Sequence, residues 1–288
     1  MNNDILSLIQ DNLSGFSKGQ KQIANYILSS YDKAAFMTAS RLGRTVNVSE
    51  STVVRFAAEL GFDGYPSMQR ALQEMIRSKL TSIQRIEVSR SRIGNHDVLS
   101  MVMQSDIEKI RMTLEETDQA AFAAAVECLS RASRVYVLGV RSAGALADFL
   151  GYYLRFMFDD VVVVDTSAMS EVFEQVLRVR PGDVFLGLSF PRYSRRTVKA
   201  MKYVKDQGAT VIALTDSRTS PLVEHADVAL LAKSDMASFV DSLVAPLSLV
   251  NALIVAVSRR RAEQLEDTLR KLEGIWSEYD EYEKPSDK

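Results

Sequence analysis

The first eighty residues place apolar side chains at helical spacing, with strand-like alternation confined to one short stretch. A helix of about three turns is predicted after Ser49, a favourable N-cap, and it ends at Gly61, which suits a left-handed helix terminus. The alternation over 45–48 would make an isolated strand without a partner, so we interpret it as a turn. The apolar faces of these helices are formed by Ile5, Leu6, Ile9, Leu13, Ile23, Tyr26, Ile27, Val53, Phe56, Ala57 and Leu60. The front of the chain is therefore predicted to be all-α.

A turn rich in Asp, Gly and Pro over 62–66 precedes a further predicted helix over 67–80. Residues 81 to about 96 contain Arg85, Arg90 and Arg92 and show little apolar periodicity, so we expect a linker over 81–105. Two amphipathic helices are predicted next, over 97–116 and 118–132.

From Arg134 the pattern changes to short apolar runs that alternate with helical stretches. The β-rich runs are 135–138, 161–164, 184–188, 210–214 and 228–231. Strands that are apolar on both faces and separated by helices indicate a parallel sheet covered on both sides. The sequence therefore predicts an α/β doubly wound domain, followed by a long helix from Phe239 to about Leu265 and a polar C-terminal tail over 276–288.

Composition fits a two-domain globular protein and excludes several classes. The chain has 288 residues, of which 47% are hydrophobic and 25% charged, which excludes wholesale disorder. Charged residues interrupt every apolar run before it reaches the length of a membrane span, and Asp4 lies where a secretory signal would be basic. We therefore expect a cytoplasmic protein that makes no contact with a membrane.

The cysteine and histidine content argues against a metal site in this protein. Cys128 is the single cysteine, and the two histidines, His96 and His225, lie far apart in the sequence. An internal disulfide is excluded, and a zinc site built of Cys and His alone cannot form. No metal and no cofactor are expected.

Charge divides unevenly along the chain. Residues 1–95 hold 12 Lys or Arg against 8 Asp or Glu, whereas the whole chain has a net charge of −2. A basic front half and an acidic back half favour a head that binds a polyanion, joined to a body that binds something else.

Residues 38–60 have the dimensions of a helix-turn-helix, with small hydroxyl side chains at the start of its second helix. Such a helix enters the major groove, so its leading residues must be short and polar, and an arginine on its outer side can contact phosphate or guanine. The candidate DNA-binding residues are Arg44, Ser49, Ser51, Thr52 and Arg55. From spacing alone, a simple helical hairpin capped by Ser49 is an equal alternative.

The stretch VSESTVVRFAAELGFDGY, residues 48–65, closely resembles the DNA-binding domain of the RpiR family of bacterial transcription regulators. In that family the helix-turn-helix precedes a sugar isomerase (SIS) domain, and residues 134–260 resemble one. The resemblance implies a helix-turn-helix domain over 1–80, the linker over 81–105, and a SIS-like, flavodoxin-like domain for effector binding and dimerisation over 106–275.

Two turns at strand ends are the candidate effector site, because ligands of open α/β sheets bind beyond the carboxyl ends of the strands. SIS domains usually carry a Gly-x-Gly-x-Ser turn at the first and a Ser-x-Ser-Gly-x-Thr turn at the second. This chain has Arg141 in place of the second Gly of one motif and Arg195 in place of the Gly of the other. Added arginine favours a carboxylate or phosphate ligand. The candidate effector-binding residues are Gly139, Arg141, Ser142, Ser189, Arg192, Ser194 and Thr197. The alternative is that Arg192, Arg195 and Arg196 simply face solvent.

Catalysis by the rear domain would need a base such as Glu171, Glu224 or His225. Glu171 would favour a helix start whatever its role, and His225 suits a surface or capping position. An isomerase would also have no evident use for a basic helix-turn-helix, so we expect no enzyme activity and name no catalytic residue.

The expected function is a DNA-binding transcription regulator, a repressor of a catabolic operon, controlled by a small anionic metabolite such as a phosphosugar or a sugar acid. We expect a homodimer, or a tetramer of paired dimers, on a near-palindromic operator of double-stranded DNA. The long apolar face of the helix after residue 239 is expected to lie partly against the second subunit. The alternatives are a sugar-phosphate isomerase with a helical appendage, and a metabolite sensor whose helical head binds protein.

Overall fold

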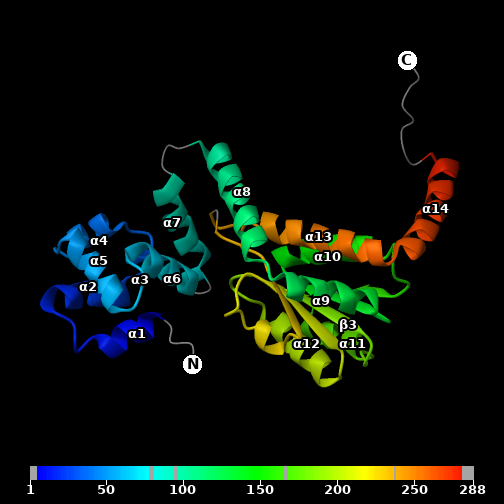
Figure 1. The fold of residues 1–288 in the computed structure, drawn as a ribbon, viewed down its shortest axis with the longest axis horizontal. Coiled ribbons are helices and arrows are strands. Elements are labelled where there is room, and N and C mark those ends of the chain that lie inside the picture. Colours follow the sequence, from blue (N-terminus) through cyan, green and yellow to red (C-terminus); the bar gives the residue numbers. More distant parts are fainter. Residues whose placement is uncertain (1–4, 78–80, 94–96, 165–167, 237, 281–288) are drawn as a thin grey trace, which may run out of the picture. The chain divides into compact units, whose positions relative to one another are not determined.

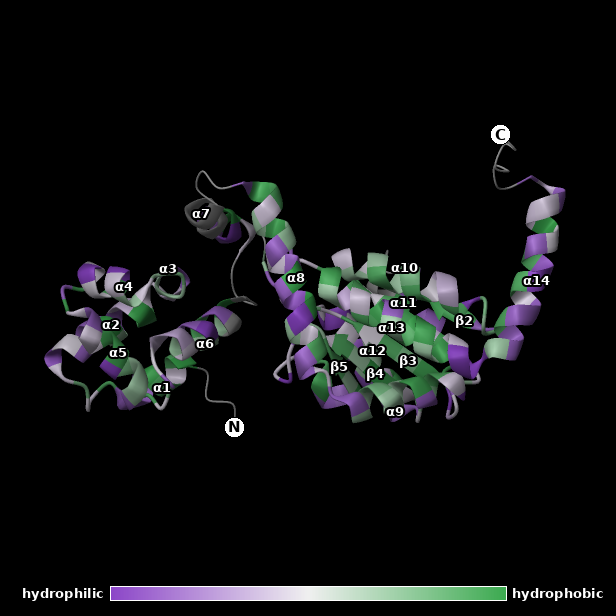
Figure 2. Ribbon diagram, turned by 45° about the horizontal axis from the view of Figure 1, so that its top comes forward, coloured by the Kyte–Doolittle hydropathy of each residue, from purple (hydrophilic) through white to green (hydrophobic). Residues whose placement is uncertain are grey.

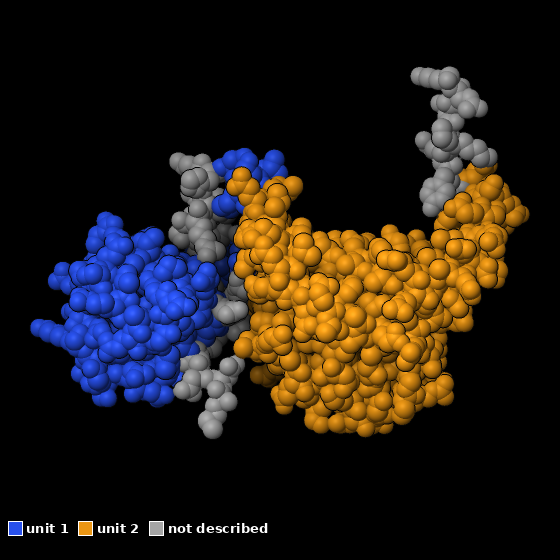
Figure 3. Space-filling view, in the orientation of Figure 1, with its two compact units in different colours: residues 1–101, 235–241 blue, residues 102–234, 242–288 orange. Residues whose placement is uncertain are grey.

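The computed structural model describes residues 5–77, 81–93, 97–164, 168–236 and 238–280. The chain divides into two compact units, residues 1–101 with 235–241 and residues 102–234 with 242–288 (Figure 3). Each unit is described by itself below.

The first unit is helical, as predicted (Figure 1). Ser17 and Gln20 form a capping box, in which the Gln20 side chain accepts a hydrogen bond of 2.9 Å from the Ser17 backbone N–H. Ser49 caps its helix as expected, and Gly61 has the left-handed φ of +85°. The helices are α1 (Ile5–Asn12), α2 (Lys18–Ser29), α3 (Tyr31–Ala34), α4 (Ala39–Thr45), α5 (Glu50–Glu59), α6 (Tyr65–Arg77) and α7 (Ser82–Ile93).

The core of this unit is built from the apolar faces that the sequence predicts. Ile9, Ile23 and Phe56 are fully buried in one cluster. The Tyr65 hydroxyl at the start of α6 donates a hydrogen bond of 2.7 Å to the Met37 carbonyl, and burial raises the pKa of Tyr65 to about 12. The phenol therefore keeps its proton at neutral pH and ties α6 to the segment after α3.

Helix α7 lies where the sequence analysis expects a linker, so periodicity did not reveal it. Its Arg85 is buried and forms an ion pair of 2.7 Å with Asp241, a residue from the segment 235–241. Met236 of the same segment joins the core of the helical unit. A segment distant in sequence thus completes the first unit.

The second unit holds five parallel strands in the order β2-β1-β3-β4-β5, which is the flavodoxin-like order. All five predicted strands are confirmed, and helices follow them as an α/β doubly wound fold requires. The strands are β1 (Val135–Gly139), β2 (Val161–Val163), β3 (Val184–Leu188), β4 (Thr210–Thr215) and β5 (Val228–Leu231). The helices are α8 (Val98–Glu116), α9 (Gln119–Ser130), α10 (Ser142–Leu154), α11 (Met169–Val176), α12 (Arg195–Asp206), the 3-10 turn η1 (Val223–His225), α13 (Val244–Arg260) and α14 (Ala262–Glu278).

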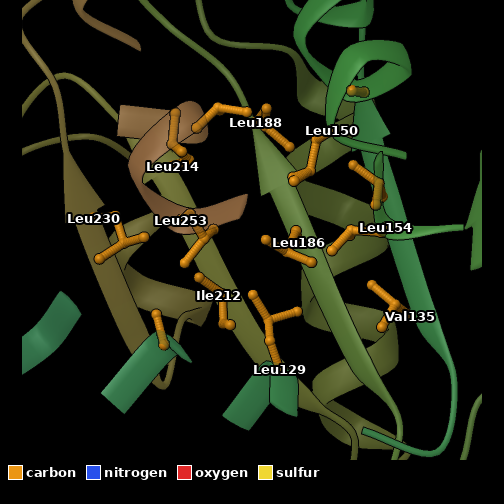
Figure 4. Packing of buried hydrophobic residues seen from close by; sticks show 14 of the residues in the cluster. Leu129, Val135, Leu150, Leu154, Leu186, Leu188, Ile212, Leu214, Leu230 and Leu253 are labelled. Atoms are coloured by element: carbon orange, nitrogen blue, oxygen red, sulfur yellow. The ribbon is translucent and has the colours of Figure 1, made fainter. Parts of the chain in front are cut away.

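Each face of the sheet is covered by its own layer of helices. Figure 4 shows Val135 beside Leu154 of α10, Ile212 beside Leu253 of α13, and Leu186 between these two leucines. The alternate strand residues, such as Tyr136 and Phe185, pack on the other face with α11 and α12. Hydrophobic residues accordingly concentrate in the strands (Figure 2).

The C-terminal region differs from the prediction in the course of its long helix. The long predicted helix is broken at Arg261 into α13 and α14. Leu249, Val250, Leu253 and Val257 of α13 are buried in the core of their own unit, whereas Val255 on the same helix is exposed. The expected partial contact of this helix with a second subunit stays a prediction. Most of the predicted tail, 281–288, lies outside the described residues. Within the described chain, no helix combines the length and the apolar character that a membrane crossing needs.

Candidate DNA-binding and effector-binding sites

The helix-turn-helix consists of α4, a turn over 46–49, and α5. Its tightness depends on Gly43, because a Cβ at this position would lie 2.8 Å from the Val48 carbonyl oxygen. Asn47 in the turn adopts a positive φ of 56°, which asparagine tolerates better than most residues. The turn therefore closes on the backbone of α4 and fixes where α5 begins.

The start of α5 displays the predicted hydroxyl residues. The Ser49 hydroxyl accepts a hydrogen bond of 3.3 Å from the Thr52 N–H and lies 2.9 Å from the Ser51 hydroxyl. Ser49 and Ser51 are exposed, as is Arg55 one turn further on, whose Nε donates to the Ser51 carbonyl at 3.3 Å. The inward side of α5 packs on α2, α4 and α6. The outer side of α5 is thus free to meet a groove of DNA.

Helix α4 supplies two further exposed arginines to this unit. Arg44 is exposed as expected and donates a hydrogen bond of 3.3 Å to the Ser40 hydroxyl. Arg41 is exposed one turn earlier and was not singled out from the sequence, although its spacing of three residues from Arg44 places both on one helix side. A first helix that crosses the DNA backbone would use such positive charges.

The first turn of the candidate effector site joins β1 to α10. A Cβ at Gly139 would lie 2.2 Å from the Ala143 carbonyl oxygen, so only glycine fits there. Arg141 precedes α10 with φ 61° and ψ −126°, a backbone conformation that normally belongs to glycine. Arg141 and Ser142 are both exposed. The turn keeps the backbone of the glycine motif while carrying an arginine side chain.

The second turn joins β3 to α12 through a chain of hydrogen bonds. The buried Ser189 hydroxyl accepts from the Ser194 N–H at 3.0 Å, and the Ser194 hydroxyl accepts from the Thr197 N–H at 3.3 Å. Thr197 is fully buried, and its hydroxyl has no hydrogen-bond partner among the described residues. These hydrogen bonds therefore fix the start of α12, and the Thr197 hydroxyl is the buried polar group that they do not satisfy.

Arg192 in the same turn also has a positive φ, of 69°, and its side chain is exposed. Beside it, the Tyr193 hydroxyl donates a hydrogen bond of 2.8 Å to Asp216, which follows β4. Burial, together with the Asp216 charge, raises the pKa of Tyr193, so the phenol stays protonated. Sequence reasoning missed this pair, because only the strand order shows that residues 193 and 216 meet.

The two turns emerge at the same edge of the sheet. Gly139 at the end of β1 pairs with Leu188 at the end of β3, so the turns leave neighbouring strands side by side. Backbone N–H groups at the starts of α10 and α12 and the nearby arginines suit an anion. Among the described residues, no group of three or more His, Cys, Asp or Glu side chains could hold a metal ion.

Two of the three candidate bases lie away from this edge. Glu224 and His225 lie in η1, just ahead of β5, whose first residue Val228 pairs with Ile212 near the start of β4. They therefore belong to the amino end of the sheet, opposite the two turns. Glu171 lies in the first turn of α11, which follows β2 and therefore begins at the carboxyl edge of the sheet. Its carboxylate accepts a hydrogen bond of 3.2 Å from the Ala168 N–H, as expected of a helix start.

Comparisons with known proteins agree with both halves of this description. Residues 3–79 match the helix-turn-helix domain of the rpiR family, and residues 128–256 match the SIS domain. An HTH-type transcriptional regulator of Haemophilus influenzae is 30% identical over 234 residues, which cover 79% of this chain and 79% of that protein.

Two solved structures have a similar fold. The sugar isomerase domain of an RpiR transcription factor from Sphaerobacter thermophilus is 32% identical with a TM-score of 0.57, and the match covers 60% of this chain and 97% of that one. Vibrio vulnificus NanR, solved with ManNAc-6P, is 22% identical with a TM-score of 0.59 over 96% of this chain and 98% of that one. The chain thus belongs to the RpiR family of transcriptional regulators, with a helix-turn-helix domain followed by a SIS domain.

Proposed function

We propose that this regulator binds a near-palindromic operator as a homodimer and responds to a small anionic metabolite held in its SIS domain. Residues 1–80 are the reading head in this proposal, and 106–275 form the sensing domain. The observation that carries it is the outer face of α5, where Ser49, Ser51 and Arg55 are exposed at the start of a helix whose position Gly43 and Ser49 fix. This is the geometry by which a recognition helix contacts base edges and phosphates.

The sensing half of the proposal rests on the two turns at the sheet edge. Arg141 and Arg192 adopt backbone conformations that cost free energy for any residue with a side chain, and such strain clusters at ligand sites. The buried Thr197 hydroxyl has no protein partner in the described chain, so a ligand oxygen would satisfy it. NanR, a protein of the same fold, was solved with a phosphorylated sugar derivative. A phosphosugar or a sugar acid is the ligand class that suits these groups.

We further propose that the domain senses its ligand without turnover, and that the protein represses a catabolic operon. Glu224 and His225 lie away from the two turns, and Glu171 already accepts a backbone hydrogen bond at its helix start. An effector changes DNA affinity only by binding more tightly to one of two states of the regulator.

The experiment that tests the reading head is operator titration with Arg55→Ala at fixed salt. Loss of the guanidinium is expected to weaken binding by about 1 to 3 kcal/mol. Arg70→Ala, which removes an exposed arginine from α6, is the matched control and is expected to change binding far less. Equal affinity for wild type and Arg55→Ala, with unchanged sequence preference, would reject α5 as the recognition helix.

A further inference from the structure

Helix α8 has its polar side packed and its apolar side in solvent. Lys109 and Thr113 are buried, the Thr113 hydroxyl accepts a hydrogen bond of 2.9 Å from the Lys233 N–H, and Asp106 accepts one of 2.6 Å from the Ser242 hydroxyl. On the other side Ile107 is 63% exposed and Leu114 is 70% exposed. A helix on the surface of a monomer normally has the reverse polarity.

The exposed apolar residues of α8 form a regular seam. Met103, Ile107, Ile110 and Leu114 are spaced by four, three and four residues, which is the a/d spacing of a coiled coil. All four are among the exposed large hydrophobic residues of the described chain. Such a stripe, which we call the α8 seam, exposes on the order of a few hundred Å², close to the largest patches that monomers leave uncovered.

Helix α14 carries a second seam of the same kind. Its apolar residues follow the same alternation of four and three, at Leu265, Leu269, Leu272, Trp276 and Tyr279, the last just beyond the helix. Leu265, the first of the row, also packs against the core of its own unit. None of the 17 residues of α14, all of them described, is buried. We call this row the α14 seam. The spacing of this row is that of one helix of a two-helix coiled coil.

The two seams of one chain cannot cover each other. Asp106 of α8 bonds to Ser242, just before the start of α13, whereas α14 begins after the end of α13. Helix α13 has 17 residues, so about 25 Å separate these two places. Figures 1 and 2 show α8 and α14 rising at opposite ends of the layer formed by α10 and α13, on the same side of it.

The layer formed by α10 and α13 also exposes large apolar side chains. Tyr152 of α10 is 54% exposed, and Val255 of α13 is 60% exposed. Tyr152 packs edge to face on Tyr153 and on Phe156, which holds the aromatic rings in place without covering them. These side chains add apolar surface to the layer that carries the two seams.

We propose that a second copy of this chain lies on this surface, and that α14 of each copy packs on the α8 seam of the other. One two-fold rotation makes both contacts at once and leaves neither seam uncovered. Two matching seams, held about 25 Å apart in one chain, suit a reciprocal exchange better than an unrelated partner, which would have to supply both complements itself. A stable dimer interface buries about 800 Å² per chain, more than a single seam of a few hundred Å² supplies, so both seams must take part in the contact.

This inference rests on the homodimer of the proposed function and names the surface that forms it. The test is sedimentation velocity of the full chain without DNA, over a range of concentrations. Wild type is expected to be dimeric at micromolar concentration. Ile107→Glu and Leu272→Glu are each expected to weaken the dimer by about a hundredfold, because each places a carboxylate in an apolar seam.

Leu177→Glu is the matched control, because Leu177 is 67% exposed and lies just after α11, on the other face of the sheet. The Leu177→Glu variant is expected to dimerise as strongly as wild type. Thermal melts followed by circular dichroism should show all variants folded, because none of the three side chains is buried. A monomeric wild type, or a dimer that tolerates Ile107→Glu, would overturn the proposed surface.

Mixing identifies which helices pair. Chains with Ile107→Glu and chains with Leu272→Lys should each be monomeric alone and form a heterodimer when combined, because one contact then joins opposite charges and the other remains wild type. If mixing restores no dimer although both variants are monomeric, the pairing of α8 with α14 is wrong. Operator titration is separate: a dimer that fails to bind DNA would reject the proposed function and leave this surface intact.

Discussion

Two arginines in glycine-like backbone conformations are the most informative single residues of the candidate effector site. Arg141 has φ 61° and ψ −126°, and Arg192 has φ 69°. The family motif implies glycine at the position of Arg141, so a side chain is kept there against a conformational cost of about 1 to 3 kcal/mol. Such a cost is understandable where the guanidinium binds a ligand.

Arg141→Gly is therefore expected to raise the stability of the fold and to abolish ligand binding. The variant should raise the free energy of unfolding by about 1 kcal/mol, because glycine adopts this conformation without strain. It should also abolish the thermal shift produced by phosphosugars and sugar acids. Chemical denaturation and thermal-shift titration measure the two effects; a variant that is less stable and still binds would show that Arg141 supports the fold instead.

Thr197→Val tests the buried hydroxyl with an isosteric change. Since that hydroxyl has no partner among the described residues, its removal should leave the free energy of unfolding unchanged or raise it by about 1 kcal/mol. Ligand affinity, measured by calorimetry with the compound that gives the largest thermal shift, should fall about tenfold. Unaltered affinity would place the ligand away from the start of α12.

At the scale of elements, the helix-turn-helix depends on close approach between a helix and its turn. Gly43→Ala would place a Cβ 2.8 Å from the Val48 carbonyl, and a backbone atom cannot move aside cheaply. We expect the free energy of unfolding to fall by about 2 kcal/mol, with weaker operator binding.

Gly19→Ala is the control for this prediction, because its Cβ would meet the Val48 side chain at an ordinary 3.4 Å. Alanine inside α2 is expected to stabilise the unit by up to about 1 kcal/mol. Denaturation curves of the two variants that shift in the same direction would contradict the account of the turn.

Most helices and strands were predictable from the local sequence pattern, but the residues and elements that they contact were not. The cap at Ser49 and the five apolar strand runs are local signals, and the structure confirms them. Periodicity shows that α8 is amphipathic, but it does not show that the polar side faces inward, because that depends on bonds to Lys233 and Ser242 far along the chain.

Contacts between residues far apart in the sequence also explain which features of the candidate sites the sequence did not predict. The turns after β1 and β3 were found from motif and strand position. The Tyr193 contact with Asp216 needs β3 and β4 to be neighbours, which only the folded sheet establishes. Helix α7 escaped notice because its anchor, Asp241, lies more than 150 residues away.

At the scale of the whole molecule, the helical unit depends on residues 235–241. Asp241→Asn removes the charge that faces the Arg85 side chain, which is 3% exposed, and should lower the stability of this unit by about 3 kcal/mol. Asp267→Asn breaks a solvent-exposed pair with Arg270 and should leave stability unchanged. Hydrogen exchange of α7 amides distinguishes the variants; equal protection in both would mean that the buried pair contributes little.

The segment that completes the helical unit also limits how such a gene can be recombined. The chain passes from one unit to the other three times, after residues 101, 234 and 241. A chimaera that took only its first 101 residues from a relative would keep this chain's own Met236 and Asp241. The relative's helices would then have to pack on a core residue and an ion-pair partner from a different protein. Transfer of specificity between relatives should therefore succeed only when residues 235–241 travel with the head.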